Sequence, residues 1–152
     1  MHLSFVSIQL TSRCNLDCKI CFRRLGLQEV DTKNIFSLIS EIAKFNVDMI
    51  VLSGGEPLLR KDLIDIIKFI KNKGIKVALQ SNGLLLSKQL DSLAGLVDVI
   101  SLSLDGPNEE INSIFRGHGH FSVIIDLLSK IKEKNIKVKL GTVITKINYK
   151  KC

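Results

Sequence analysis

Three cysteines, Cys14, Cys18 and Cys21, stand within eight positions in the stretch CNLDCKIC, with the spacing C-x3-C-x2-C. The only other cysteine, Cys152, is the last residue, and we expect it to be a free thiol rather than a ligand. Thiolates bind soft metals such as zinc and iron. The tight trio therefore indicates metal or redox chemistry more than disulfide bonds.

Three thiols leave a metal site incomplete. A structural zinc takes four protein ligands, so His118 or His120 would have to complete a Cys3His site from a distant loop. A cluster of four irons also normally takes four cysteines. With three, one iron stays open to a substrate or a cofactor. The spacing alone leaves three interpretations: a cluster with an open iron, a zinc site, or cysteines that stand together by accident.

The elements that position these thiols follow from the apolar pattern. Runs of β-formers predict five strands, at 4–10, 47–53, 75–81, 97–104 and 136–145. Amphipathic spacing predicts helices at 32–45, 59–74, 87–96 and 121–135, with 105–120 as a loop. The alternation predicts an α/β fold with a parallel sheet, in one domain over residues 1–152.

Two of the predicted helices have a clear apolar face. In the first, the face consists of Ile35, Leu38, Ile39, Ile42 and Phe45. In the second, it consists of Leu63, Ile66, Ile67 and Ile70. We expect both faces to be buried against the sheet.

Polar turns follow four of the predicted strands. They are GGEP (54–57), SNG (81–83), SLDG (103–106) and TKIN (145–148). In parallel α/β sheets, chemistry gathers at the carboxyl ends of the strands. The turns are therefore expected at the same end of the sheet as the cysteines.

These motifs resemble a known family. CNLDCKIC (14–21), followed by SGGEP (53–57) after the next strand, resembles the signature of the radical S-adenosylmethionine (SAM) superfamily. The resemblance continues in order through QSNG (80–83), SLDG, RGHGHF (116–121) and TVITKIN (142–148), over essentially the whole chain. It implies a partial, TIM-like (β/α) barrel, of which this chain supplies about five of the usual six units.

The resemblance also implies the cofactors. Cys14, Cys18 and Cys21 would hold a 4Fe-4S cluster, and SAM would chelate its fourth iron. An electron from a flavodoxin- or ferredoxin-type donor would cleave SAM to a 5′-deoxyadenosyl radical, which abstracts hydrogen from a substrate. The motifs are most similar to the branch that modifies peptides or makes cofactors. No side chain is assigned a catalytic role, because the cofactor carries the chemistry.

Residues at the strand ends are implied to bind SAM. Gly54, Gly55 and Glu56 resemble the turn that receives the methionine amino group, since glycine permits close backbone approach and a carboxylate accepts from ammonium. Arg116 matches an arginine that faces the methionine carboxylate, which suits its fork of donors. The other implied site residues are Asn82, Ser103, Asp105 and Val143, with Thr142 also near the adenine. Without the cysteines, each of these would be an ordinary turn, core or surface residue.

Several positions differ from the family pattern or lie outside its motifs. Ile20 stands where relatives commonly have an aromatic residue, which keeps apolar contact with adenine but loses stacking. Phe22 is expected to pack the loop onto the barrel, and His118 and His120 are expected to be exposed loop residues. A sixth strand is missing, so we expect a C-terminally incomplete core domain: a fragment, one half of a split protein, a decayed copy, or a chain whose open barrel edge is covered by a partner chain or a second copy.

Composition excludes some other classes. The formal net charge is +7, but the lysines are dispersed and the chain has one tyrosine and no tryptophan, which does not favour nucleic-acid binding. No stretch approaches the roughly 20 apolar residues that span a bilayer. The first residues lack the features of a secretory leader, so we expect a cytoplasmic chain.

Three functional hypotheses follow. The leading one is a radical SAM enzyme acting on an unidentified substrate. The second is a non-catalytic protein or partner subunit that binds a cluster or SAM. The third is a zinc-stabilised interaction module.

Overall fold

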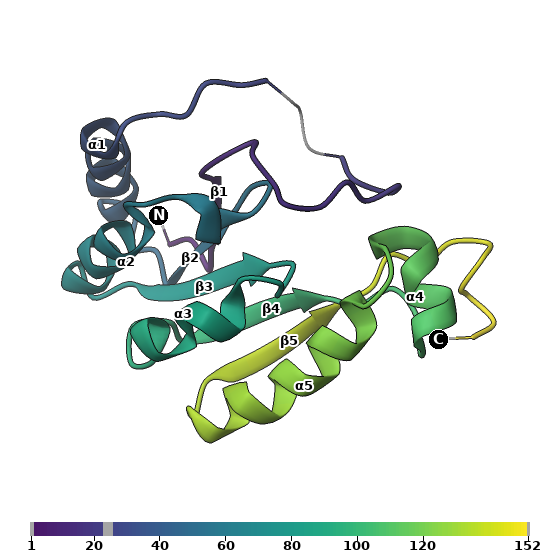
Figure 1. Cartoon of the computed structure of the whole chain (residues 1–152). Coiled ribbons are helices and arrows are strands. Elements are labelled where there is room, and N and C mark those ends of the chain that lie inside the picture. The colour runs from purple at the N-terminus through teal and green to yellow at the C-terminus, as the bar shows by residue number, and fades with distance from the viewer. Residues whose placement is uncertain (1, 23–25, 152) are drawn as a thin grey trace.

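The computed structural model describes residues 2–22 and 26–151, which form one sheet flanked by helices (Figure 1). The strands are β1 (Val6–Gln9), β2 (Met49–Ser53), β3 (Lys76–Ser81), β4 (Val99–Ser103) and β5 (Lys137–Gly141). The helices are α1 (Thr32–Ala43), α2 (Leu63–Asn72), α3 (Leu86–Leu93), α4 (Glu109–Arg116) and α5 (His120–Glu133), with a short 3-10 helix, η1 (Pro57–Leu59). The predicted alternation of strands and helices is confirmed.

The sheet has the order β1-β2-β3-β4-β5, and every neighbouring pair is parallel. The chain therefore returns to the same end of the sheet before each strand, so all five carboxyl ends lie along one edge. This open parallel sheet, with five strands that alternate with helices, is the predicted partial TIM-like barrel. β5 ends at Gly141, four residues earlier than predicted, because Thr142 and Val143 bond to the main chain and side chain that follow β4.

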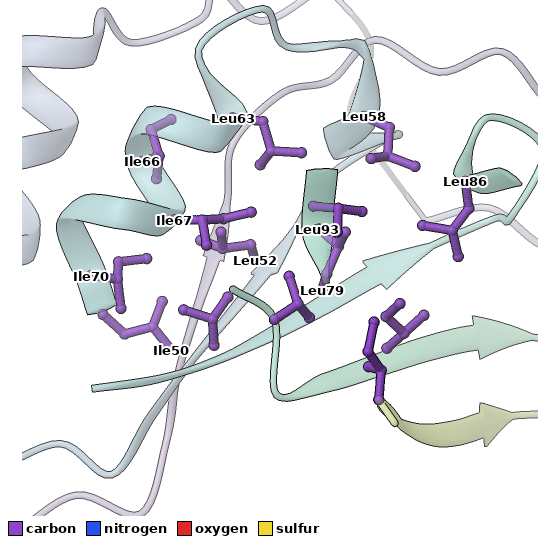
Figure 2. Packing of buried hydrophobic residues seen from close by; sticks show 14 of the residues in the cluster. Ile50, Leu52, Leu58, Leu63, Ile66, Ile67, Ile70, Leu79, Leu86 and Leu93 are labelled. Atoms are coloured by element: carbon purple, nitrogen blue, oxygen red, sulfur yellow. The ribbon is translucent and has the colours of Figure 1, made fainter. Parts of the chain in front are cut away.

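The core lies between the sheet and the helices that cover it. Leu63, Ile66, Ile67 and Ile70 of α2 are all buried, as predicted. They pack over Ile50, Leu52 and Leu79 of β2 and β3 (Figure 2). Burying each such side chain contributes about 1.5–3 kcal/mol, so this interface fixes the strands whose ends carry GGEP and SNG.

The predicted face of α1 is only partly correct. Ile35 and Ile39 are buried, but Leu38 is 48% exposed and Phe45 is 44% exposed. Phe36, which the predicted face did not include, instead packs against the core and stacks on Phe69 of α2, with ring centroids 4.2 Å apart. Phe45 lies beyond the end of α1 at Ala43.

The prediction of a loop over 105–120 is wrong, because α4 lies inside it. The side chain of Asn108 caps the helix by accepting from the main-chain N–H of Ile111. Ile111 and Phe115 are buried one helical turn apart. α5 begins soon after, at His120. In Figure 1, α4 lies beyond the arrowheads of β4 and β5, and α5 runs back beside β5.

β1 and β5 are the two edge strands of the sheet. All residues of β5 are exposed, including Val138 at 37% and Leu140 at 45%. The open edge expected from the sequence is therefore present in the part of the chain that the structure describes.

Candidate functional site

A cavity of about 270 Å³ lies at the carboxyl ends of the strands. It is lined by most of the residues that the sequence singled out, which are Cys14, Cys18, Cys21, Gly54, Gly55, Asn82, Ser103, Arg116, Thr142 and Val143. Two of the predicted residues, Glu56 and Asp105, are not among its lining residues. The structure thus brings residues from the cysteine loop and from the ends of β2, β3, β4 and β5 around one space.

The loop that carries the cysteines is held at both of its ends by one buried arginine. Arg60, whose side chain is 4% exposed, donates to the main-chain oxygens of Leu10 and Val30 at 2.9 and 3.1 Å. Its charge is paired with Asp62 at 2.6 Å, and Arg60 holds the pKa of that carboxyl at about 2. A second ion pair, Arg13 with Glu29 at 2.7 Å, closes the loop again nearer the cysteines. The thiols therefore sit on a loop with fixed ends.

The GGEP turn lies directly against the beginning of this loop. The N–H groups of Gly55 and Glu56 donate to the main-chain oxygens of Thr11 and Arg13, at 2.7 and 2.8 Å. A Cβ added at Gly54 would lie 2.5 Å from the oxygen of Thr11, and one at Gly55 would lie 2.1 Å from that of Arg13. Since such contacts are impossible, both glycines are required for this approach.

Side-chain N–H donors contact the sulfurs of Cys14 and Cys18. Asn82 Nδ2 lies 3.6 Å from the sulfur of Cys14, and an Arg116 terminal nitrogen lies 3.6 Å from that of Cys18. Burial raises the pKa of the Cys18 thiol, while the charge of Arg116 opposes the rise. The Cys14 and Cys21 thiols act in the same direction as burial and also raise the pKa of Cys18. Cys152 lies outside the described residues.

The donor set fits an iron–sulfur cluster with three protein ligands. Three soft thiols face one cavity, and N–H donors at sulfur are the outer contacts that such clusters use. As they stand, no three His, Cys, Asp or Glu side chains of residues 2–22 and 26–151 are grouped closely enough to hold a metal ion. Ligation would therefore draw the cysteine loop together around the metal.

Glu56 is completely buried and faces away from the cavity. Its carboxylate accepts from the main-chain N–H of Leu58 at 3.1 Å and that of Asn82 at 2.8 Å, and from the hydroxyl of Ser81. Burial raises the pKa of Glu56, and these donors oppose the rise. The carboxylate thus ties the GGEP turn to the SNG turn.

Asp105 is also fully buried and organises the ends of β4 and β5. It accepts from Nε of Arg116 at 2.5 Å and from the main-chain N–H of Val143 at 2.8 Å. Asn148 donates to the main-chain oxygens of Asp105 and Val143 from the TKIN turn. Asp105 therefore positions Arg116 and Val143, which line the cavity, while Asp105 itself stays behind them.

The expectation for the two histidines holds only for His118. His118 is exposed, whereas His120 is 1% exposed at the first position of α5. The ring nitrogens of His120 lie 3.0 Å from the oxygen of Asn82 and 3.0 Å from Nδ2 of Asn112. Because both nitrogens are engaged, His120 cannot complete a Cys3His zinc site in this arrangement.

Other lining residues were missed or misplaced from the sequence. Phe22 is 85% exposed at the rim of the cavity, so the expectation that it packs the loop onto the barrel is wrong. Ile20 lines the cavity. Gln9, Gln80 and Ser101 add polar groups from β1, β3 and β4. The sequence did contain a signal for them, because each is a polar residue within an otherwise apolar strand. The sequence prediction considered only the turns after the strands.

Comparisons with known proteins agree with this geometry. The family model of the Radical SAM superfamily matches residues 8–151. Molybdenum cofactor biosynthesis protein 1 of Dictyostelium discoideum is 38% identical over 156 residues, which cover 95% of this chain and 25% of that protein. Fe-coproporphyrin III synthase of Methanosarcina barkeri is 33% identical over 148 residues, which cover 93% of this chain and 37% of that protein. The chain thus spans well under half of these relatives.

Solved structures share the fold. SuiB of Streptococcus suis bound to its precursor peptide SuiA superposes with a TM-score of 0.85, at 21% identity, over 99% of this chain and 35% of that one. SuiB bound to S-adenosylmethionine superposes with a TM-score of 0.84. Within the described residues, no helix has both the length and the apolar character needed to cross a bilayer.

Proposed function

The chain belongs to the Radical SAM superfamily, and from that premise we propose that its cavity binds a 4Fe-4S cluster and SAM in order to begin hydrogen abstraction from a substrate. Members of this family are enzymes that use these two cofactors. One observation carries the proposal for this chain: the cysteine trio and the implied SAM-binding residues line one cavity. When bound and reduced, the cluster supplies the electron that cleaves SAM into methionine and a 5′-deoxyadenosyl radical.

Cys14, Cys18 and Cys21 are the proposed cluster ligands. Arg60 and the Arg13–Glu29 pair hold the ends of their loop, so fewer conformations are lost when the thiols close on a metal. Asn82 and Arg116 hold two of the sulfurs by N–H contacts. Ile20 and Phe22, on either side of Cys21, line the same cavity.

Gly54, Gly55, Ser103, Arg116 and Val143 are the proposed SAM contacts. The glycine main chain is the surface that receives the methionine amino group, and Glu56 supports it from behind. Arg116 has five N–H donors, so it can pair with the methionine carboxylate while it keeps Asp105. Val143 offers an apolar surface for adenine. Asn82 and Asp105 position these groups.

The proposed substrate is a peptide or the precursor of a cofactor. The names of the two relatives refer to molybdenum cofactor and coproporphyrin, and SuiB was solved with a precursor peptide. Polar groups of Gln9, Gln80 and Ser101 line the cavity, which suits a substrate with amide or carboxylate groups. A flavodoxin- or ferredoxin-type protein is the proposed electron donor, in the cytoplasm.

A further protein segment is proposed to cover β5, either a partner chain or a second copy. The edge exposes Val138 and Leu140 together with unpaired main-chain groups. Sedimentation of the purified chain alone measures whether a second copy is that cover. A monomer at all concentrations would exclude a homodimer.

The test of the proposed function is anaerobic reconstitution with iron and sulfide, followed by reduction with dithionite in the presence of SAM. We expect about four irons per chain, the broad visible absorbance of an iron–sulfur cluster, and release of 5′-deoxyadenosine. Cys18→Ala should abolish all three, and Cys152→Ala is the matched control thiol. A cluster without 5′-deoxyadenosine would support the non-catalytic binding protein, and a colourless zinc protein would support the interaction module.

A further inference from the structure

His120 lies at the centre of a buried polar chain whose protonation is fixed by its partners. Its Nε2 is 3.0 Å from the main-chain oxygen of Asn82, which only accepts, so Nε2 carries the proton. Asn112 accepts from the main-chain N–H of Asp105 at 2.9 Å, so its amide NH2 faces His120. Nδ1 of His120 therefore accepts from Asn112 at 3.0 Å. The ring is neutral, with its single proton on Nε2.

One direction from His120 leads to the first cysteine. Asn82, whose main-chain oxygen His120 holds, accepts from the N–H of Leu84 through its side-chain oxygen at 3.0 Å. This contact turns the amide NH2 of Asn82 toward the cysteine loop. There it lies 2.7 Å from the side-chain oxygen of Asn15 and 3.6 Å from the sulfur of Cys14.

The other direction leads to the second cysteine. Asn112, which donates to His120, holds the main chain of Asp105 through its oxygen. The Asp105 carboxylate binds Nε of Arg116 at 2.5 Å. A terminal nitrogen of the same guanidinium lies 3.6 Å from the sulfur of Cys18. Cys14 is thus contacted by Asn82 at the end of β3, and Cys18 by Arg116, which Asp105 holds at the end of β4. His120 is hydrogen-bonded to both groups, to Asn82 directly and to Asp105 through Asn112.

A buried histidine that merely fills space would not need this arrangement. His120 has 1% of its surface exposed, and an apolar side chain of similar volume would occupy the same place without desolvating two ring nitrogens. Each nitrogen instead bonds to a group that is connected to a proposed cluster ligand: Asn82 contacts Cys14 directly, and Asn112 reaches Cys18 through Asp105 and Arg116. Its neighbour His118, two residues earlier, is exposed.

We infer that His120 is a positioning residue of the cluster site: its neutral ring couples Asn82 to Asn112 and so holds the N–H donors of Asn82 and Arg116 against Cys14 and Cys18. The inference rests on the proposed cluster. Donors at the sulfurs of a cluster stabilise its more negative, reduced form. His120 therefore holds the midpoint potential of the cluster higher than the thiols alone would, without touching cluster or SAM.

The test compares His120→Leu with the wild-type chain and with His118→Leu as the matched control, all anaerobically reconstituted. His120→Leu should lose iron to a chelator at least about tenfold faster, the size of effect typical for lost outer contacts of a metal site. The midpoint potential of the clusters that remain should move to a more negative value. His118→Leu should match the wild type in both. Because Gln can donate to Asn82 and accept from Asn112, His120→Gln should restore much of both properties.

The outcomes separate the two proposals. A wild-type chain that takes up no cluster would overturn the proposed function and this inference together. A wild-type chain that loads its cluster, with His120→Leu unchanged in potential and in iron loss, would overturn this inference alone. A lower melting temperature with an unchanged potential would show that His120 is purely structural. If His120→Leu does not fold, Asn112→Leu replaces it in the test. An unchanged midpoint potential and an unchanged rate of iron loss in Asn112→Leu would then overturn this inference.

Discussion

Nε of Arg116 lies 2.5 Å from Oδ2 of Asp105, a carboxylate with no exposed surface. This ion pair connects α4 to the end of β4, and it orients a guanidinium whose other side reaches Cys18. The pair therefore stabilises the fold and also fixes the orientation of Arg116, which lines the cavity.

Removing the arginine should leave the buried carboxylate unpaired. We expect Arg116→Met to lower the free energy of unfolding by about 3 kcal/mol, since breaking a buried pair is more costly than replacing it. The double variant Asp105→Asn with Arg116→Met should lose less than the sum of the single changes. Urea unfolding of the four chains measures the coupling. Additive losses would mean that the pair contributes no coupling energy.

Glu56 gives a prediction about hydrogen-bond polarity. Its carboxylate accepts from two main-chain N–H groups, so in Glu56→Gln the amide NH2 must face at least one donor. We expect a loss of about 1–3 kcal/mol, the cost of one buried unsatisfied donor. The loss should appear although burial raises the pKa of Glu56 and would by itself favour a neutral side chain. Thermal unfolding at neutral pH measures it, and a stabilised variant would contradict the acceptor role.

The sequence predicted the strand–helix alternation because apolar period and turn residues are local properties. It also predicted that strand-end residues such as Asn82 and Ser103 meet at one cavity, because parallel strands end at the same edge. The hydrogen bonds of Glu56 could not be predicted from the sequence, because they depend on how close the SNG turn lies to the GGEP turn in the folded chain. The burial of His120 likewise depends on α4, which the sequence analysis had predicted to be part of a loop.

Gly55 tests how closely the GGEP turn must approach the cysteine loop. A methyl group there would lie 2.1 Å from the main-chain oxygen of Arg13, so Gly55→Ala must push the loop away. We expect weaker protection from hydrogen exchange at the N–H of Glu56, which bonds to that oxygen, and less iron after reconstitution. Gly141→Ala is the matched control, because its methyl would meet nothing nearer than 3.9 Å. Equal protection in both variants would show that the loop adapts without cost.

Asp62 predicts how stability changes in acid. Arg60 lowers the pKa of Asp62 from its ordinary 3.8 to about 2, so the folded chain binds this proton less readily than the unfolded chain. The contribution to stability is therefore full above pH 3.8 and is lost as the pH falls toward about 2. In Asp62→Asn, the free energy of unfolding should be lower at neutral pH and should fall less steeply across this window. If the free energy of unfolding had the same pH dependence in the wild-type chain and in Asp62→Asn, Asp62 would not be the group responsible.

His120 predicts a second loss of stability, at milder pH. Burial lowers the pKa of His120 below its ordinary 6.5, and Arg116 acts in the same direction, while the Asn82 oxygen, Asp105 and Glu109 oppose it. Between the lowered pKa and 6.5, the unfolded chain binds a proton that the folded chain does not, so stability falls as the pH decreases through this range. Urea unfolding between about pH 7.5 and about pH 5.5 should show the decline in the wild-type chain and in His118→Gln. It should be smaller in His120→Gln, and an equal decline in all three would place the responsible group elsewhere.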